Sequence, residues 1–165
     1  TVFLEDLIKI PKEYSSGVVK CKVVYDDSIK GISFARYVPK PVNGLFLVDG
    51  NNIDYSYKYS DRSKLDELLT AANCGFDEDI LIVKNGLITD TSYSNVALFD
   101  GTDWLTPSAP LLAGTKRAKL LEEGKIRTGE IAAAELKYFE KIKLFNAMLD
   151  FDECPTLPVA CINQS

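Results

Sequence analysis

The stretch Ile80-Leu-Ile-Val-Lys-Asn-Gly-Leu-Ile-Thr-Asp-Thr-Ser-Tyr-Ser-Asn95 decides the fold of this 165-residue chain. It opens with four apolar residues, and Asn85-Gly86 follows them. Because Asn-Gly accepts the positive φ angles of a tight primed turn, residues 80–83 and 87–89 are predicted to form a β-hairpin. Residues 96–99 and 104–105 repeat this pattern around Asp100-Gly101. The middle of the chain is therefore predicted to be antiparallel sheet.

Further elements are predicted on both sides of this sheet. Residues 17–25 and 29–37 favour another hairpin, and Pro39-Lys40-Pro41 then interrupts regular structure. A buried strand is predicted at residues 45–48 and another at 142–145. Apolar spacing favours helices over residues 61–72, 115–123 and 130–137, with Ser60 or Asp61 as the N-cap of the first. Pro155 and Pro158 favour an irregular tail or a sheet edge.

Composition excludes several classes of function. Nineteen basic and 24 acidic residues give a net charge of −5 without a basic cluster, so nucleic acid and anionic membranes are not expected partners. The apolar runs are too short to span a bilayer and no signal pattern opens the chain, which predicts a soluble, cytoplasmic protein. The chain has no histidine, and its four cysteines form no Cys-x-x-Cys pair. These features argue against a metal site and against His-assisted hydrolysis.

Three segments carry candidate chemistry, and each also has an ordinary structural explanation. Lys58 lies among Tyr55, Tyr57 and Tyr59, which could bury its amine and lower its pKa, although a surface lysine on a loop is the simpler interpretation. Residues 89–95 form a hydroxyl-rich loop that could bind an anion, or that could be a turn between two strands. Gly114 opens a helix whose free N–H groups suit a phosphate, or it is ordinary capping after a proline-rich loop.

Read together, these segments resemble the class IV aminotransferase and aminodeoxychorismate lyase family, whose cofactor is pyridoxal phosphate. Asp90 followed five places later by Asn95 is similar to the family's acid-to-asparagine motif. Pro110-Leu-Leu-Ala-Gly-Thr-Lys-Arg117 is similar to its helix-opening motif, and Lys143-Leu-Phe-Asn-Ala-Met148 to a late strand and turn of the lyase branch. Lys58, about thirty residues before Asp90, lies where the family's Schiff-base lysine belongs.

The resemblance implies a role for each of these residues. Lys58, with Arg62 four places later, would hold the cofactor and shuttle a proton, and Asp90 would pair with the ring nitrogen. The remaining residues implied to bind the cofactor are Tyr93, Ser94, Asn95, Gly114, Thr115, Lys116, Asn146 and Ala147. The implied activity is that of an aminotransferase, similar to branched-chain amino acid aminotransferases, or of a lyase, and it acts on a small amino-acid-like substrate in a cytoplasmic homodimer.

The resemblance also implies an architecture. It is an α+β (α/β) fold with a partial small α/β domain at residues 1–37, a linker at 38–43, and a larger β-rich pseudo-barrel domain with flanking helices at 44–165. The family begins with a strand, a glycine turn and a helix whose arginine grips the phosphate, which do not precede Thr1. We therefore expect the chain to be part of a protein about a quarter longer.

One substitution keeps a second hypothesis open. The family's acid is usually glutamate, whereas position 90 is aspartate, one methylene shorter. Together with the missing arginine, this substitution favours the alternative that the chain is a catalytically silent homologue, which keeps the fold as a binding or assembly module.

Overall fold

The computed structural model describes residues 3–163, which divide into two compact units on either side of the Pro39–Lys40 junction. The sequence placed its linker at residues 38–43, so the observed division falls within that range. The outermost residues of the predicted ranges 1–37 and 44–165, namely 1–2 and 164–165, lie outside the described residues. The interpretation of the two units as a partial small domain and a cofactor-binding domain remains a prediction.

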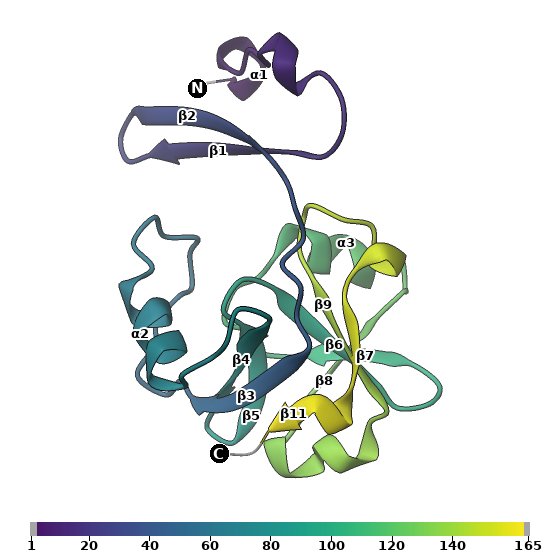
Figure 1. Cartoon of the computed structure of the whole chain (residues 1–165). Helices are drawn as coiled ribbons and strands as arrows, with labels where there is room; N and C mark the ends of the chain where they lie inside the picture. The colour runs from purple at the N-terminus through teal and green to yellow at the C-terminus, as the bar shows by residue number, and fades with distance from the viewer. Residues whose placement is uncertain (1–2, 164–165) are drawn as a thin grey trace. The chain divides into compact units, whose positions relative to one another are not determined.

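The first unit is a β-hairpin preceded by short helical turns (Figure 1). Its elements are α1 (Leu4–Leu7), the 3₁₀ turn η1 (Lys12–Tyr14), β1 (Val19–Tyr25) and β2 (Ile29–Arg36). The two strands are antiparallel, with Val19 opposite Arg36, which confirms the hairpin predicted from the sequence. Tyr14 stacks on Phe34 with ring centroids 6.0 Å apart, so η1 packs against one face of the hairpin.

The second unit is built around one large sheet. Its strands are β3 (Gly44–Asp49), β4 (Glu78–Lys84), β5 (Leu87–Thr91), β6 (Asn95–Phe99), β7 (Trp104–Pro107), β8 (Arg127–Gly129), β9 (Lys141–Phe145), β10 (Thr156–Pro158) and β11 (Ile162–Asn163). Its helices are α2 (Ser63–Ala71) and α3 (Thr115–Glu122), with 3₁₀ turns η2 (Ala133–Tyr138), η3 (Phe151–Glu153) and η4 (Val159–Cys161).

The sheet is mixed rather than purely antiparallel. Within the described residues its strand order is β10-β9-β6-β5-β4-β3-β11, and β7 pairs with β6 and β8. β4, β5, β6 and β9 are antiparallel neighbours, as predicted for the middle of the chain, and Asn85 (φ 52°) and Gly86 (φ 78°) form the expected turn. The antiparallel prediction does not extend to β3, which runs parallel to both β4 and β11.

β4 is an interior strand of the sheet, and both of its faces are covered. Ile80 and Ile82 pack in a cluster with Leu65 of α2, while Leu81 packs in a second cluster with Leu45 of β3. All four residues from 79 to 82 are fully buried. A strand covered on both faces has a continuous apolar run instead of alternation, which explains the Ile-Leu-Ile sequence.

The structure corrects one prediction and confirms another. The helix expected at residues 130–137 is the 3₁₀ turn η2, whereas the tail, predicted to be irregular or at a sheet edge, contains the short strands β10 and β11 at the two ends of the strand order. α2 begins at Ser63, where Asp61 accepts a hydrogen bond from the Ser63 N–H at 2.9 Å, so Asp61 satisfies one of the free N–H groups without occupying the N-cap position itself. In the part of the chain that the structure describes, no helix has the length and apolarity needed to cross a membrane.

Candidate active site

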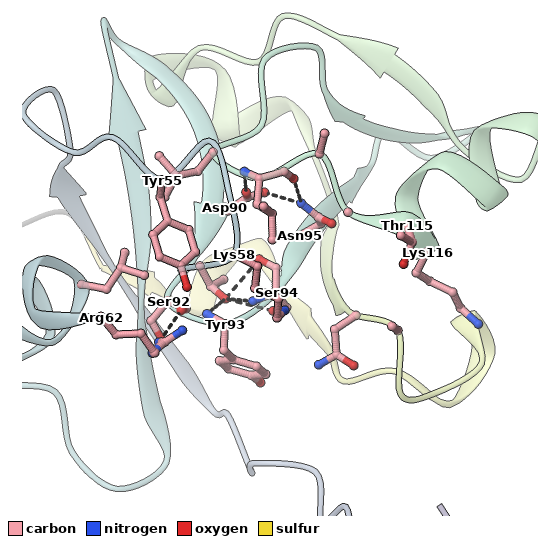
Figure 2. A pocket seen from close by; sticks show the side chains of 18 residues that line it. Tyr55, Lys58, Arg62, Asp90, Ser92, Tyr93, Ser94, Asn95, Thr115 and Lys116 are labelled. Atoms are coloured by element: carbon pink, nitrogen blue, oxygen red, sulfur yellow. Dashed lines mark hydrogen bonds between the residues drawn. The ribbon is translucent and has the colours of Figure 1, made fainter. Parts of the chain in front are cut away.

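The second unit contains a cavity of about 210 Å³ at the ends of β5 and β6 and the start of α3 (Figure 2). One water molecule in the liquid occupies about 30 Å³, so the cavity can hold a small organic group. All eleven residues predicted for the site line it: Lys58, Arg62, Asp90, Tyr93, Ser94, Asn95, Gly114, Thr115, Lys116, Asn146 and Ala147. Segments almost 90 residues apart in the sequence therefore meet at one place.

Asp90 is the buried acid of the cavity. It lies on β5 with an exposed fraction of 4%, and burial raises its pKa to about 6, although hydrogen bonds from Asn95 and Leu112 oppose that rise. Its Oδ1 accepts from Asn95 Nδ2 at 2.9 Å and its Oδ2 accepts from the Leu112 N–H at 2.8 Å. A carboxylate has about four acceptor positions, so Asp90 retains capacity for a donor placed in the cavity.

Asn95 connects Asp90 to the segment that leads into α3. Its Nδ2 donates both to Asp90 and to the Leu112 carbonyl, at 2.9 and 2.8 Å, which uses both N–H bonds of the amide. A Cβ atom at Gly114 would collide with Asn95 Oδ1, so position 114 requires glycine for space, although its φ of −69° suits any residue. The geometry therefore favours Asn95 as a group that positions Asp90 rather than one that binds a ligand through its amide nitrogen.

The loop between β5 and β6 uses its polar groups internally. The Thr91 and Ser94 hydroxyl oxygens lie 2.9 Å apart, and Thr91 Oγ1 also accepts from the N–H groups of Tyr93 and Ser94 at 3.4 and 3.1 Å. The family resemblance implied that backbone groups around Tyr93 and Ser94 cradle a phosphate. This role stays a prediction, and both N–H groups are directed at Thr91.

The start of α3 is better suited to an anion. Gly114 is its N-cap with extended backbone and makes no side-chain cap, and the first hydrogen bond within the helix runs from the Ala118 N–H to the Gly114 carbonyl. The N–H groups of the first turn therefore have no partner within the helix and point along the positive end of its dipole. Lys116 adds a positive charge and pairs with Asp150 at 3.1 Å. Phosphate or carboxylate binding is the ordinary use of such a helix end.

Lys58 and Arg62 line the opposite wall, ahead of and at the start of α2. Arg62 Nη2 donates to the Ser92 carbonyl at 2.8 Å, which ties this segment to the β5–β6 loop, as Figure 2 shows. Lys58 is exposed, and Tyr57 is 72% exposed, so the tyrosines do not bury the lysine as the sequence analysis suggested. Lys58 nevertheless lines the cavity.

Sequence reasoning missed seven other lining residues: Tyr55, Leu65, Thr91, Ser92, Leu111, Leu112 and Ala113. Most of these residues are neighbours in sequence of the predicted site residues, so the sequence pointed to their segments without singling them out. Leu65 and Leu111 belong to the cluster that covers one face of β4. Their apolar side chains carry no chemical signature that would distinguish a cavity wall from the core.

The family can now be identified from the whole sequence. Residues 64–151, more than half of the chain, match the model of the family described as amino-transferase class IV. The chain belongs to the class IV aminotransferase family. An uncharacterized protein of Haemophilus influenzae is 38% identical over 145 residues, which cover 88% of this chain and 76% of that protein.

Solved structures of class IV relatives share the fold. A "putative 4-amino-4-deoxychorismate lyase" from Haemophilus somnus is 37% identical, with a TM-score of 0.73, over 79% of this chain and 66% of that one. The pyridoxal-phosphate-bound form of a "hypothetical aminotransferase" from Mycobacterium tuberculosis has a TM-score of 0.65 over 89% of this chain and 63% of that one, at 17% identity. The chain thus spans slightly less than two thirds of these two proteins, and the second likeness concerns the fold alone.

Proposed function

We propose that this chain binds pyridoxal phosphate in the cavity and acts as an aminotransferase or aminodeoxychorismate-lyase-like enzyme on a small amino acid. The observation that carries the proposal is that an amine, a buried acid and an open helix start, Lys58, Asp90 and the first turn of α3, line one cavity. These groups match the reactive carbonyl, the ring nitrogen and the phosphate of that cofactor in chemical type. The M. tuberculosis aminotransferase of the same fold binds it.

The residues of the cavity fit this cofactor. Asp90 has unused acceptor capacity, and the N–H groups of the first turn of α3 have no side-chain cap from Gly114. When bound, pyridoxal phosphate supplies an electron-accepting ring that stabilises a carbanion at the substrate Cα. Because the chain has no histidine, its chemistry requires another proton carrier.

Each residue then has a defined task. Lys58 would attach the cofactor through its ε-nitrogen and, once displaced by the substrate amine, would take and return the Cα proton at that same nitrogen. Asp90, held by Asn95, would place its negative charge beside the ring nitrogen and keep that nitrogen protonated, and the burial of Asp90 strengthens this interaction. The N–H groups of Thr115 and Lys116 would hold the phosphate. Leu65 and Leu111 form apolar parts of the wall and would exclude water from the ring.

The test is formation of the coloured complex. The purified chain mixed with pyridoxal phosphate should gain an absorbance band in the violet, and borohydride reduction followed by peptide mass mapping should place the label on Lys58. Lys58→Ala should abolish the band and the label. Lys64→Ala, which changes an exposed lysine in the first turn of α2, is the matched control and should retain both. A label on another lysine, or none, would refute the assignment.

Substrate and partner are tested separately. A product that forms only when a 2-oxo acid acceptor is present indicates the aminotransferase, and elimination without an acceptor indicates the lyase. The resemblance of this chain to its family also leads us to propose a homodimer and a cytoplasmic location. Sedimentation equilibrium and cell fractionation test these two statements.

A catalytically silent homologue is the second candidate. The observation that favours it is that both oxygens of Asp90 already accept hydrogen bonds from the protein, and that aspartate reaches less far than the family's glutamate. On this alternative the chain stays colourless with excess cofactor. Asp90→Glu would then be expected to restore the band, because the longer side chain brings the acid closer to the ring position.

A further inference from the structure

Asp79 is a second buried acid, and nothing in the proposed chemistry uses it. It lies on β4 with an exposed fraction of 0%. Its Oδ1 accepts from the Ile80 N–H at 2.8 Å, whereas Oδ2 makes no hydrogen bond to any residue in the described range 3–163. Burial raises the pKa of this carboxyl, and the neighbouring Ser92 hydroxyl is the largest influence that lowers it.

A protonated carboxyl explains this environment better than an ionised one. An ionised carboxylate without full hydrogen bonding is among the most unfavourable groups to bury. A neutral carboxyl carries an O–H donor, which needs one acceptor nearby. The hydroxyls of Thr91 and Ser92, 3% and 5% exposed, are the neighbouring side-chain groups. Thr91 Oγ1 already interacts with Ser94, so Ser92 Oγ is the better acceptor.

We propose that Asp79 is a positioning residue for the cavity: in its protonated form its carboxyl donates a hydrogen bond to Ser92 Oγ and so fixes the β5–β6 loop from the side of β4. Ser92 lines the cavity, and its carbonyl accepts from Arg62 Nη2 at 2.8 Å. Asp79 therefore acts through Ser92 on Arg62. The effect on ligand binding rests on the proposed function, whereas the hydrogen bond itself does not.

Lys40 and Cys74 are titratable groups near Asp79, and their effects on the pH dependence must be distinguished from the effect of Asp79. Lys40, ahead of β3, lowers the Asp79 pKa through its charge and donates to the Glu78 carbonyl at 2.6 Å. Cys74, after α2, has a pKa raised first by burial and then by the charges of Asp79 and Glu78. Replacing Asp79 alone, with Lys40 and Cys74 unchanged, isolates its own contribution to any pH dependence.

The first test uses the protein without cofactor. The folded-state pKa of Asp79 is raised above its unfolded value near 3.8, so the folded state binds more protons and stability should fall as pH rises through this window. Asp79→Asn keeps a donor but cannot ionise. The urea midpoint of Asp79→Asn should therefore exceed that of the unmodified chain by a margin that grows as the pH rises above the unfolded-state pKa and levels off once the pH passes the raised folded-state pKa. A margin that does not change with pH would overturn the proposal.

The second test measures the dissociation constant of pyridoxal phosphate. Asp79→Ala should weaken binding by about 3- to 10-fold, as expected for one lost hydrogen bond, and Asp79→Asn should restore it to within about 2-fold. Ser92→Ala should weaken binding similarly, and the double variant no more than either single one. Additive losses, or an Asn variant as weak as the Ala variant, would refute the coupling. An unmodified chain that binds no cofactor would refute the proposed function, and the first test would still decide whether Asp79 is protonated in the folded protein.

Discussion

Gly114→Ala should destabilise the second unit although its backbone accepts alanine. The φ of −69° and ψ of 142° at this position are ordinary for any residue, so the cost comes from the new methyl group and not from backbone strain. That methyl group would meet Asn95 Oδ1, which must turn away. Turning the Asn95 side chain breaks its hydrogen bonds to Asp90 and to the Leu112 carbonyl.

The magnitude follows from these two hydrogen bonds. The bond to Asp90 involves a group that is mostly ionised at neutral pH and contributes about 1.5–3 kcal/mol, and the bond to Leu112 contributes about 1 kcal/mol. Partial relaxation of the loop recovers some of this. We expect Gly114→Ala to lower the free energy of unfolding by about 2–4 kcal/mol, within the range of overpacking substitutions.

The assay is urea unfolding followed by the fluorescence of Trp104, the single tryptophan, which lies in the second unit. Gly44→Ala is the matched control, because a Cβ there makes only ordinary contacts, and its effect should stay below about 0.5 kcal/mol. In an Asn95→Ala background the collision partner is gone, so Gly114→Ala should cost less than about 1 kcal/mol. Equal costs of Gly114→Ala in the two backgrounds would refute the reasoning.

Two further predictions concern the charges of the cavity. Asp90 must be ionised to pair with a protonated ring nitrogen, so the affinity for pyridoxal phosphate should fall by up to about tenfold per pH unit below pH 6, and Asp90→Asn should remove that dependence. If the affinity of the unmodified chain for pyridoxal phosphate does not change with pH, this prediction is wrong. Lys116→Met should weaken phosphate binding about tenfold, while Lys119→Met, an exposed lysine on the same helix, should not. The Asp150 side chain of the Lys116–Asp150 ion pair is largely exposed, and an exposed ion pair contributes little to stability. Lys116→Met should therefore change the free energy of unfolding, measured with heat or urea, by less than about 1 kcal/mol.

Local chemistry made the strands around the cavity predictable. Asn85-Gly86 specified its turn through the positive φ angles that both residues adopt. The apolar run that begins at Ile80 specified a buried strand. Neither pattern predicts whether β3 runs parallel or antiparallel to β4, because a fully buried strand has the same apolar residues in both cases. The parallel pairing of β3 with β4 depends on the long connection through α2, which a local pattern does not encode.

The residues that line the cavity could be named as a set because three segments together resemble the motifs of one family, although each segment alone has an ordinary structural explanation. Their individual hydrogen bonds were not predictable. Asn95 was expected to contact the cofactor, whereas its amide nitrogen is used by Asp90 and Leu112, and the N–H groups of the β5–β6 loop are used by Thr91. Asp79 gave no signal, since an acid beside Glu78 in the sequence looks like a solvated strand end, and only the packing of the sheet buries it.

The close approach of Gly114 to Asn95 has an evolutionary consequence. Any relative that gains a side chain at the position of Gly114 must give up the amide at the position of Asn95, and it then needs another donor for its acid. The two positions should therefore change together across the family. A lineage that altered only one of them would be expected to lose affinity for the proposed cofactor before it lost its fold.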